Sequence, residues 1–308
     1  MKLIARILAF LLLLRGLKGS QTPTGQGIPS RRSEGSEPDT PLDLEKRDWK
    51  ASVKRAVKEI QQDRIPFIAA GMAYYFFLAI FPALIALIGV LGLAQVDASG
   101  LVDSVRASLP GGAGEALTQA IARADRPPES ASLIAAVAGI AVALWSASSG
   151  FVALQSGLNV AYDVEKDRKF FGARGVALLL LLATAGLGGV PSPIFTFGES
   201  TVFTVIGWVV TVIAIMVLFS LLFYLGPNRP SPSWHWVSAG GIVGGLLWMA
   251  SSLVFGFYVS TFNNYDKTYG PLGGVIVLIL WLYLSSLSVL IGGELNSELE
   301  KQAAAKGD

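Results

Sequence analysis

The stretch Trp145–Phe171, WSASSGFVALQSGLNVAYDVEKDRKFF, decides how this chain folds. It ends a run without charged residues that begins at Ser130, so we expect it to be the end of a membrane-spanning helix. Spacings of seven, four and four residues place four polar side chains along one helical face: Ser148, Gln155, Asn159 and Asp163. Because lipid offers no hydrogen bonds, this polar stripe should face protein or water.

The composition is that of a membrane protein. Of the 308 residues, 52% are hydrophobic and only 15% are charged, whereas a soluble domain usually has about 25% charged residues. The sequence has no cysteine and one histidine, which excludes disulfides, thiolate metal ligands and cysteine nucleophiles. It also has no nucleotide-binding, zinc-protease or serine-hydrolase motif. We therefore expect no enzyme, no metal site and no cofactor.

Six charge-free windows each exceed the roughly 20 residues that a helix needs to cross the hydrocarbon core. They predict an all-α fold, a bundle of six transmembrane helices within residues 65–300. The expected spans are residues 67–94, 132–160, 175–192, 201–226, 237–262 and 270–294. Pro191 and Pro193 indicate a tight hairpin between the third span and the fourth.

The distribution of positive charge predicts the orientation. Eighteen Lys and Arg residues fall on one side, in residues 15–64, the second-to-third and fourth-to-fifth connections, and the tail 301–308. Only four fall on the opposite side. Because Lys and Arg are enriched in cytoplasmic loops, both termini should be cytoplasmic.

Two segments precede the first span. Residues 1–41 should be an extension followed by a disordered linker, and residues 1–20 are either dispensable, as after a misassigned start codon, or a targeting device. Residues 42–64 predict a basic amphipathic helix with Trp49 on its apolar stripe. An ordinary solvated helix is the alternative to one that lies on the anionic leaflet. We expect lipid head groups to contact Lys50, Lys54, Arg55 and Lys58.

The one sizeable external segment is residues 97–129, where two short amphipathic patterns flank a Pro-Gly-Gly turn. About thirty residues are too few for a domain with its own core. We expect this segment to cap the bundle or to lie on the outer leaflet. It is also the place where an envelope protein partner would dock.

Small residues mark the expected helix contacts. Gly139 belongs to a ridge of small residues that recur every four positions in the second span. The fifth span contains two overlapping GxxxG patterns, formed by Gly240, Gly241, Gly244 and Gly245. These patterns predict close packing, either within one chain or between two copies in a homo-oligomer. Pro82 should kink the first span, and the kink either shapes the bundle or acts as a hinge.

The last span ends in GGELNSELE, residues 292–300, where Glu294 and Glu298 are one helical turn apart. Ordinary interfacial carboxylates are one interpretation of this pair. The alternative is a cytoplasmic polar cluster, in which the two carboxylates join Asp163, Arg168 and Asn296.

Three blocks carry a resemblance to a known family. They are AAGMAYYFFLAIFP at Ala69–Pro82, the stretch Trp145–Phe171, and YGPLGGVIVLILWLYLSSLSVLIGGELNSELE at Tyr269–Glu300. Each block combines aromatic, Gly and polar positions in a specific order. On these blocks, residues from about 48 to 301 resemble the YihY/BrkB-like family of bacterial inner-membrane proteins. The resemblance implies a six-helix polytopic protein of the bacterial inner membrane. The family's activity is unsettled, with an old ribonuclease label and proposals of transport that include lipid-related export.

The first functional hypothesis is a transporter or flippase-like exporter of a lipid or another amphiphile, with membrane lipids as partners. It depends on the polar stripe, on a kinked Gly-rich bundle and on a basic helix that can gather anionic head groups. A cation/proton antiporter is the second hypothesis, although the six windows contain no acidic residue. A non-transporting envelope scaffold is the third. A ribonuclease comes last and we expect no nucleic-acid partner, since a membrane surface explains the basic segment equally well.

The surroundings of Gln155 and Asn159 distinguish these hypotheses. The two amides either line a solvated pathway or hold helices together through hydrogen bonds. A cavity or a lipid beside them would favour transport. A tightly packed stripe with every amide satisfied would favour the scaffold.

Overall fold

The computed structural model describes residues 40–41, 44–93, 133–189, 201–229, 232–261 and 271–307. The chain divides into two compact units, Met1–Gly35 and Ser36–Asp308, and the described residues all belong to the second. The external segment 97–129, the hairpin prolines Pro191 and Pro193, and residues 1–39 lie outside the described residues. The expectations about them stay predictions.

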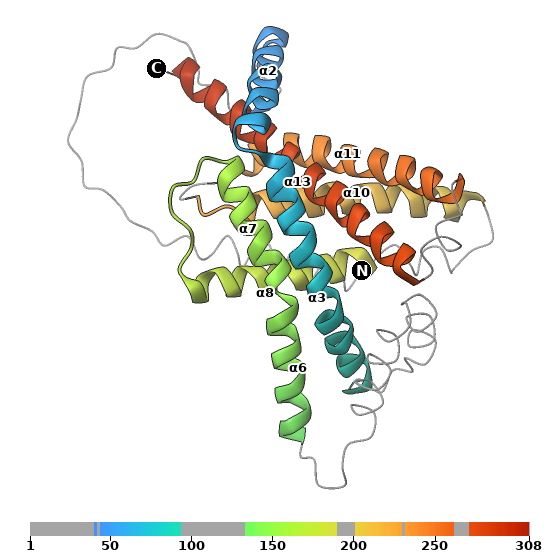
Figure 1. Cartoon of the computed structure of the whole chain (residues 1–308). Coiled ribbons are helices and arrows are strands. Elements are labelled where there is room, and N and C mark those ends of the chain that lie inside the picture. Colours follow the sequence, from blue (N-terminus) through green and yellow to red (C-terminus); the bar gives the residue numbers. More distant parts are fainter. Residues whose placement is uncertain are drawn as a thin grey trace. The chain divides into compact units, whose positions relative to one another are not determined.

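The regular structure of the described residues is helical (Figure 1). The helices are α2 (Lys46–Gln62), α3 (Ile65–Leu93), α6 (Leu133–Ala147), α7 (Ser149–Ala161), α8 (Phe170–Gly189), α10 (Thr201–Leu225), α11 (Trp234–Thr261) and α13 (Pro271–Gly307). Six segments are long and apolar enough to cross a membrane: Ile65–Leu87, Val137–Ala161, Phe170–Leu187, Thr204–Leu225, Trp236–Val259 and Gly273–Lys306. An all-helical protein with six candidate membrane-spanning helices is therefore confirmed.

The largest difference from the expected boundaries is at the end of the chain. The last helix was expected to end at residue 294 and a tail to follow from residue 301, but α13 continues to Gly307. Residues 298–306 are strong helix formers, and residues 295–306 contain no Gly or Pro. Leu295, Leu299 and Ala303 recur every four residues and are buried beside Leu44 and Trp236, which stabilises the added turns.

The regular hydrogen bonding of the second span is interrupted next to Ser148, although Ser148 itself has a helical backbone, with φ −68° and ψ −10°. α6 ends at Ala147 and α7 begins at Ser149. The hydroxyl of Ser148 donates to the Trp145 carbonyl at 2.7 Å, and the hydroxyl of Ser149 donates to the Ser146 carbonyl at 2.7 Å. Serine hydroxyls compete in this way with backbone N–H groups for helical carbonyls, which accounts for the break.

The buried core lies where α3, α7, α10 and α13 meet. Met72, Leu158, Phe223 and Leu290 are nearly inaccessible and belong to one contiguous cluster. The outward face of α11 exposes large apolar side chains instead; Leu253 is 71% exposed and Phe257 is 72% exposed. Apolar side chains outside such a core are suited to a lipid environment.

Three of the expected packing glycines lie at close helix contacts. A Cβ atom at Gly240 would meet the Gly292 carbonyl and the Asn296 side chain, and Cβ atoms at Gly241 and Gly244 would meet Ser220 and Phe219. Gly245 has ordinary van der Waals neighbours. α11 can therefore approach both α10 and α13 closely.

Gly139 does not lie at a helix contact within the described chain, so packing between two copies is the part of this prediction that stays open. It is exposed, and a Cβ atom there would meet nothing within 4 Å. α6 instead faces α3 through Ile140, which lies against Gly89. Ile140 is one residue further along, and one residue rotates the contact by about 100° around the helix.

Helix α2 docks on α13 through a polar face. Its buried residues are Asp48, Ser52 and Ala56, and the Ser52 hydroxyl donates to the Glu298 carbonyl at 3.3 Å. The indole of Trp49 is half-buried and donates to the Pro41 carbonyl at 3.0 Å.

Candidate functional site

The four stripe residues do not lie on one continuous helix. Ser148 lies at the break between α6 and α7, and Asp163 lies beyond the end of α7 with a φ of 50°. Only Gln155 and Asn159 share a face of α7. Ser148, Gln155 and Asn159 are at most 5% exposed, whereas the Asp163 side chain is 56% exposed.

Gln155 lies against the start of α8 and the connection that precedes it. Its Nε2 donates to the Ala173 carbonyl at 2.9 Å, and its Oε1 accepts from Arg168 at 3.1 Å. Arg168 also donates to the carbonyls of Gly226 and Pro227, directly after the C-terminus of α10. A cation is favourable at that end of a helix. Burial lowers the pKa of Arg168, although a guanidinium stays charged in proteins.

Asn159 is equally well bonded. Its Nδ2 donates to Asp167 at 2.5 Å, and its Oδ1 accepts the backbone N–H of Asn228 at 2.8 Å. The amide oxygen and nitrogen of both side chains are therefore hydrogen-bonded within the protein, to α8, to the connection before it and to the connection after α10. A tightly packed stripe whose amides are all hydrogen-bonded was expected if these side chains hold the bundle together. In this conformation the arrangement therefore favours that role over an open pathway.

The helix break has a charged partner from the next span. Arg174 of α8 donates to the Ser148 hydroxyl at 3.0 Å and to the Trp145 carbonyl at 3.1 Å. Its guanidinium also lies 5.1 Å from the centre of the Trp145 ring. A carbonyl at a break in a span needs a new donor, and Arg174 supplies it together with a cation–π contact.

The break lies opposite Pro82 of α3. α3 and α6–α7 are antiparallel neighbours, because Gly150 lies against Phe76 and Gly89 lies against Ile140. Pro82 falls between Phe76 and Gly89, on the level of Trp145. Pro82 has no N–H to donate to the carbonyl four residues earlier. Two adjacent spans therefore lose regular hydrogen bonding, at Pro82 of α3 and next to Ser148. Figure 1 shows α3 beside α6 and α7.

The polar cluster expected from Asp163, Arg168, Glu294, Asn296 and Glu298 divides into three separate contacts. Arg168 binds the stripe and α10, as described. Asn296 accepts from the Gly240 N–H at 2.6 Å and donates to the Val237 carbonyl at 3.1 Å, which joins α13 to α11. Glu294 and Glu298 face the other way, since residue 296 is about 200° around the helix from residue 294.

The carboxyl cluster, as we call Asp63, Asp163, Glu294 and Glu298, lies between α2, the end of α7 and α13. Lys301 bridges Asp163 at 2.5 Å and Glu298 at 2.7 Å. Glu298 is also paired with Arg55 at 2.6 Å. Glu294 is only 1% exposed and, among the described residues, its Oε1 has no hydrogen-bond partner.

Asp63 completes this cluster from the junction of α2 and α3. Burial, and then the negative charge of Asp163, raise the pKa of its carboxyl, and Lys301 and a hydrogen bond with Glu294 oppose that rise. The next residue, Arg64, has a φ of 53°. Asp163 has a similar left-handed backbone, which is uncommon for residues other than glycine. Two unusual backbone conformations thus flank one group of carboxyls.

The sequence interpretation missed Asp63 and Arg174 as members of these sites. Arg174 counted only as a positive charge in a connection, and Asp63 only as the end of a basic helix. The available signal was position, because each lies within one turn of the expected end of a span. An ionisable group there must find a partner or snorkel toward water.

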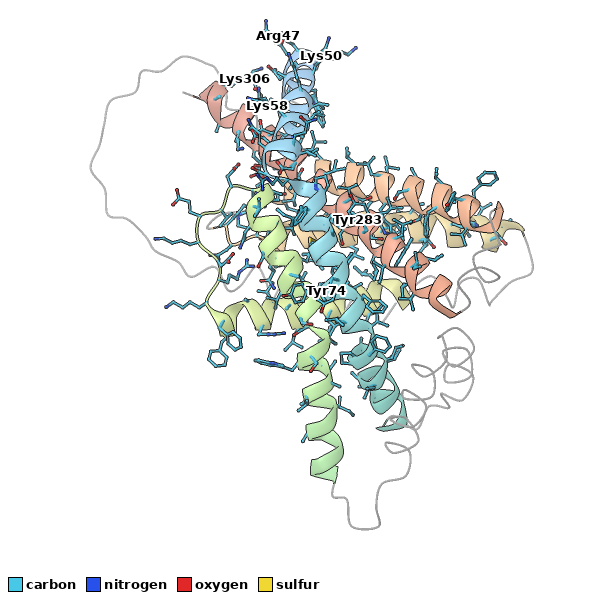
Figure 2. All side chains as sticks on the ribbon, viewed as in Figure 1. Arg47, Lys50, Lys58, Tyr74, Tyr283 and Lys306 are labelled. Carbon is cyan, nitrogen blue, oxygen red and sulfur yellow. The ribbon has the colours of Figure 1, made fainter. Side chains whose placement is uncertain are left out.

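The expected head-group contacts fall into two groups. Lys50, Lys54 and Lys58 are exposed, on the same side of α2 as the exposed Val53 and Val57. Figure 2 shows Lys50 and Lys58 on α2, with Lys306 of α13 nearby. Arg55 does not share this exposed face, because it pairs with Glu298 and donates to Gln302 at 2.7 Å.

The comparisons with known proteins are consistent over most of the chain. Residues 56–308 match the family described as virulence factor BrkB. A protein of Bacillus subtilis named ribonuclease-like protein YfkH is 32% identical over 250 residues, 76% of this chain and 90% of its own length. A UPF0761 membrane protein of Idiomarina loihiensis is 36% identical over 94 residues, which cover 30% of this chain and 33% of that protein.

A second UPF0761 membrane protein, from Rhodospirillum centenum, is 29% identical over 164 residues, 51% of this chain and 36% of that protein. No solved structure matches the chain. The matched segments contain the helix break, both ends of the polar stripe and the carboxyls of α13. The chain therefore belongs to the BrkB family, the YihY or UPF0761 family of multi-pass membrane proteins.

Proposed function

We propose that this protein is a transporter of the bacterial inner membrane that moves a lipid or another amphiphile, with both termini in the cytoplasm. The observation that carries the proposal is the interruption of the second span at Ser148, opposite Pro82 of the first. Discontinuous spans are a recurrent feature of transporters, where irregular backbone lets one part of a bundle move against another. The exposed Lys50, Lys54 and Lys58 of α2 support an anionic amphiphile as substrate.

The polar stripe has a different role in this proposal from the one that its spacing first indicated. Gln155 and Asn159 hold α7 to the connection before α8 and to the end of α10, through Arg168 and Asn228. We infer that these bonds form a closed gate, which has to open during transport. Hydrogen bonds between spans are suited to this role, because each contributes only about 0.6 to 2 kcal/mol.

The satisfied amides favour a second candidate function, a non-transporting envelope scaffold. A scaffold needs a rigid bundle, and fully bonded buried amides provide rigidity. The two candidate functions differ in whether the break and the kink must move. A variant that straightens α3 without removing a contact therefore separates them.

The test compares Pro82→Ala with Pro66→Ala on the same helix. Pro82 lies inside α3, where alanine restores a backbone N–H, whereas Pro66 lies in the first turn, where that N–H has no helical partner. Purified wild type and both variants are reconstituted into vesicles that contain fluorescent anionic phospholipid. Translocation is measured by quenching from outside, and unfolding is measured on the same samples in detergent.

For a transporter we expect Pro82→Ala to be at least as thermostable as wild type and to translocate lipid about tenfold more slowly. Pro66→Ala should match wild type in both measurements. Equal rates of lipid translocation by Pro82→Ala and wild type would contradict a hinge role for Pro82. If vesicles with wild-type protein translocate lipid no faster than protein-free vesicles, lipid transport is rejected. The envelope scaffold is then the remaining candidate function.

A further inference from the structure

We propose that Arg174 binds the phosphate of an anionic phospholipid, whose acyl chain lies over the aromatic rings beside it. The lipid site, as we call Trp145, Phe170, Phe171 and Arg174, lies where the start of α8 packs against the break between α6 and α7. The proposal rests on the proposed transport function, which it deepens by naming the residue that holds the phosphate of the substrate.

The depth of Arg174 is the first support. Arg174 belongs to the candidate span Phe170–Leu187, and its Nη1 donates to Ser148, near the middle of the candidate span Val137–Ala161. The 13 residues of α7 follow Ser148, so about 20 Å of helix separates this guanidinium from the end of its neighbouring span. A cation inside a span is costly and normally pairs with another group.

The second support is that Arg174 has no carboxylate partner among the described residues. The two hydrogen bonds that it makes there come from Nη1 and go to a carbonyl and a hydroxyl, which are neutral acceptors. Its Nε is buried without an acceptor. The side chain is partly exposed, and no hydrogen bond within the described chain comes from its Nη2. We therefore assign Nη2 to the phosphate.

The chemistry of a guanidinium favours a phosphate as this missing partner. Phosphate oxygens accept charge-assisted hydrogen bonds, and arginine is the side chain best suited to donate them. Lys169, directly before α8, is exposed and adds a second positive charge. The anions that a membrane offers are the head groups of anionic lipids. Charge complementarity therefore predicts a preference for an anionic phospholipid over a zwitterionic one.

Exposed aromatic rings provide the surface for an acyl chain. Trp145 is 39% exposed, Phe170 is 61% exposed and Phe171 is 80% exposed. The ring centres of Trp145 and Phe170 are 5.9 Å apart, and those of Phe170 and Phe171 are 5.4 Å apart, so the three rings form one patch. Arg174 lies at this patch, with its guanidinium 5.1 Å from the Trp145 ring and 6.0 Å from the Phe170 ring.

The backbone of α8 is also open beside Arg174. A Cβ atom at Gly172 or Gly175 would meet nothing within 4 Å. Small residues let another molecule approach a helix closely. An acyl chain can therefore lie directly on this part of α8, next to the aromatic rings.

A purely structural role is the alternative for Arg174. In that role its Nη1 supplies donors at the helix break and does nothing more. Such a residue would affect stability, but it would not make the protein prefer one phospholipid over another. Lipid preference therefore distinguishes the two roles.

The experiment measures lipid binding to the purified full-length protein in detergent. Native mass spectrometry compares phosphatidylglycerol with phosphatidylcholine of the same acyl chains. Thermal unfolding gives an independent readout, because a lipid that binds the folded protein raises its unfolding temperature. We expect wild type to bind phosphatidylglycerol about tenfold more tightly than phosphatidylcholine, a difference of about 1.4 kcal/mol.

Three variants test the assignment. Arg174→Gln removes the charge, keeps an N–H donor for the break and should lose the preference for phosphatidylglycerol in both readouts. Lys166→Gln is the matched control, because Lys166 is an exposed cation of the connection before α8, and it should keep the preference. Phe170→Glu puts a carboxylate four residues before Arg174, on the same helical face. That carboxylate should compete with the phosphate and abolish the preference although Arg174 is present.

Each outcome decides for or against the lipid site. Equal affinity of wild type for the two lipids would overturn it, as would a preference that Arg174→Gln retains. Should Arg174→Gln not fold, Phe170→Glu decides, because Phe170 is largely exposed and a retained preference there contradicts the assignment. Inorganic phosphate alone that raises the unfolding temperature as much as phosphatidylglycerol does would also overturn it, in favour of a site for free anions.

Lipid translocation by the same wild-type preparation separates this proposal from the proposed function. Preferential binding of phosphatidylglycerol without translocation would reject transport and support the lipid site. Translocation without that preference would reject the lipid site and leave transport intact.

Discussion

Buried amides explain most about this protein at the scale of single residues. The spacing of Gln155 and Asn159 predicted that they share a helical face and avoid lipid, and both are at most 5% exposed. Their partners were not predictable from the sequence. Arg168 and Ala173 follow in the next connection and helix, and Asn228 is 69 residues away from Asn159. Periodicity places a side chain on a face, but the packing of other elements decides what lies there.

A double substitution at these amides tests the bonding. Gln155→Leu with Asn159→Leu should lower the free energy of unfolding by about 1 to 3 kcal/mol. The reason is that α7 loses its side-chain hydrogen bonds to α8 and to the connections before α8 and after α10. Ser156→Leu is the matched control, since Ser156 lies between them on α7 and is exposed. Unfolding in detergent measures both. Equal stability of the double variant and the control would contradict a bonded stripe.

At the scale of whole helices, hydropathy predicted which segments are helical better than where they end. A charge-free window does not show that α13 continues through its charged turns to Gly307, because those turns are stabilised by Leu44 and Trp236. The amphipathic pattern of α2 predicted a helix, but it did not predict the polar face that packs on α13. Asp48 is buried because Lys306 and Gln302 of α13 bind it.

The glycines of α11 provide the prediction at this scale. Gly240→Ala should lower the free energy of unfolding by about 1 to 3 kcal/mol, since its Cβ atom would meet the Gly292 backbone and Asn296. Gly256→Ala on the same helix meets nothing within 4 Å. It should be neutral or stabilise the helix by up to about 1 kcal/mol. Denaturation of the two purified variants measures their free energies of unfolding. A Gly240→Ala variant more stable than Gly256→Ala would contradict close packing at Gly240.

At the scale of the whole molecule, the orientation in the membrane is still a prediction. The absence of cysteine makes the chain a background for single-cysteine labelling without prior substitution. Gly112→Cys should react with an impermeant maleimide from outside intact cells. Lys166→Cys and Ala304→Cys, both at exposed positions, should react only after the membrane is opened. Labelling of Lys166→Cys in intact cells would reverse the assigned orientation.

The number of spans and the helical class were readable because they depend on local apolar composition. The carboxyl cluster was readable in part, since one interpretation of the sequence placed Asp163 with Glu294 and Glu298. Asp63 was not predicted, because only the folded chain brings it near them. A charge-free window ends where charge begins, so Glu294 entered the prediction only through its spacing with Glu298. The most constrained carboxyl of α13 is the first residue beyond such an end.

The length of α13 has a mechanical consequence. Thirty-seven residues make a rod of about 55 Å, nearly twice the thickness of a hydrocarbon core. Its far end is clamped to α2 by the Asp48–Lys306 and Arg55–Glu298 pairs. A lever of that length amplifies small rotations, and a tilt of about 5° displaces its tip by about 5 Å. Movement of the apolar half of α13 is thereby conveyed to the lysine-bearing surface of α2.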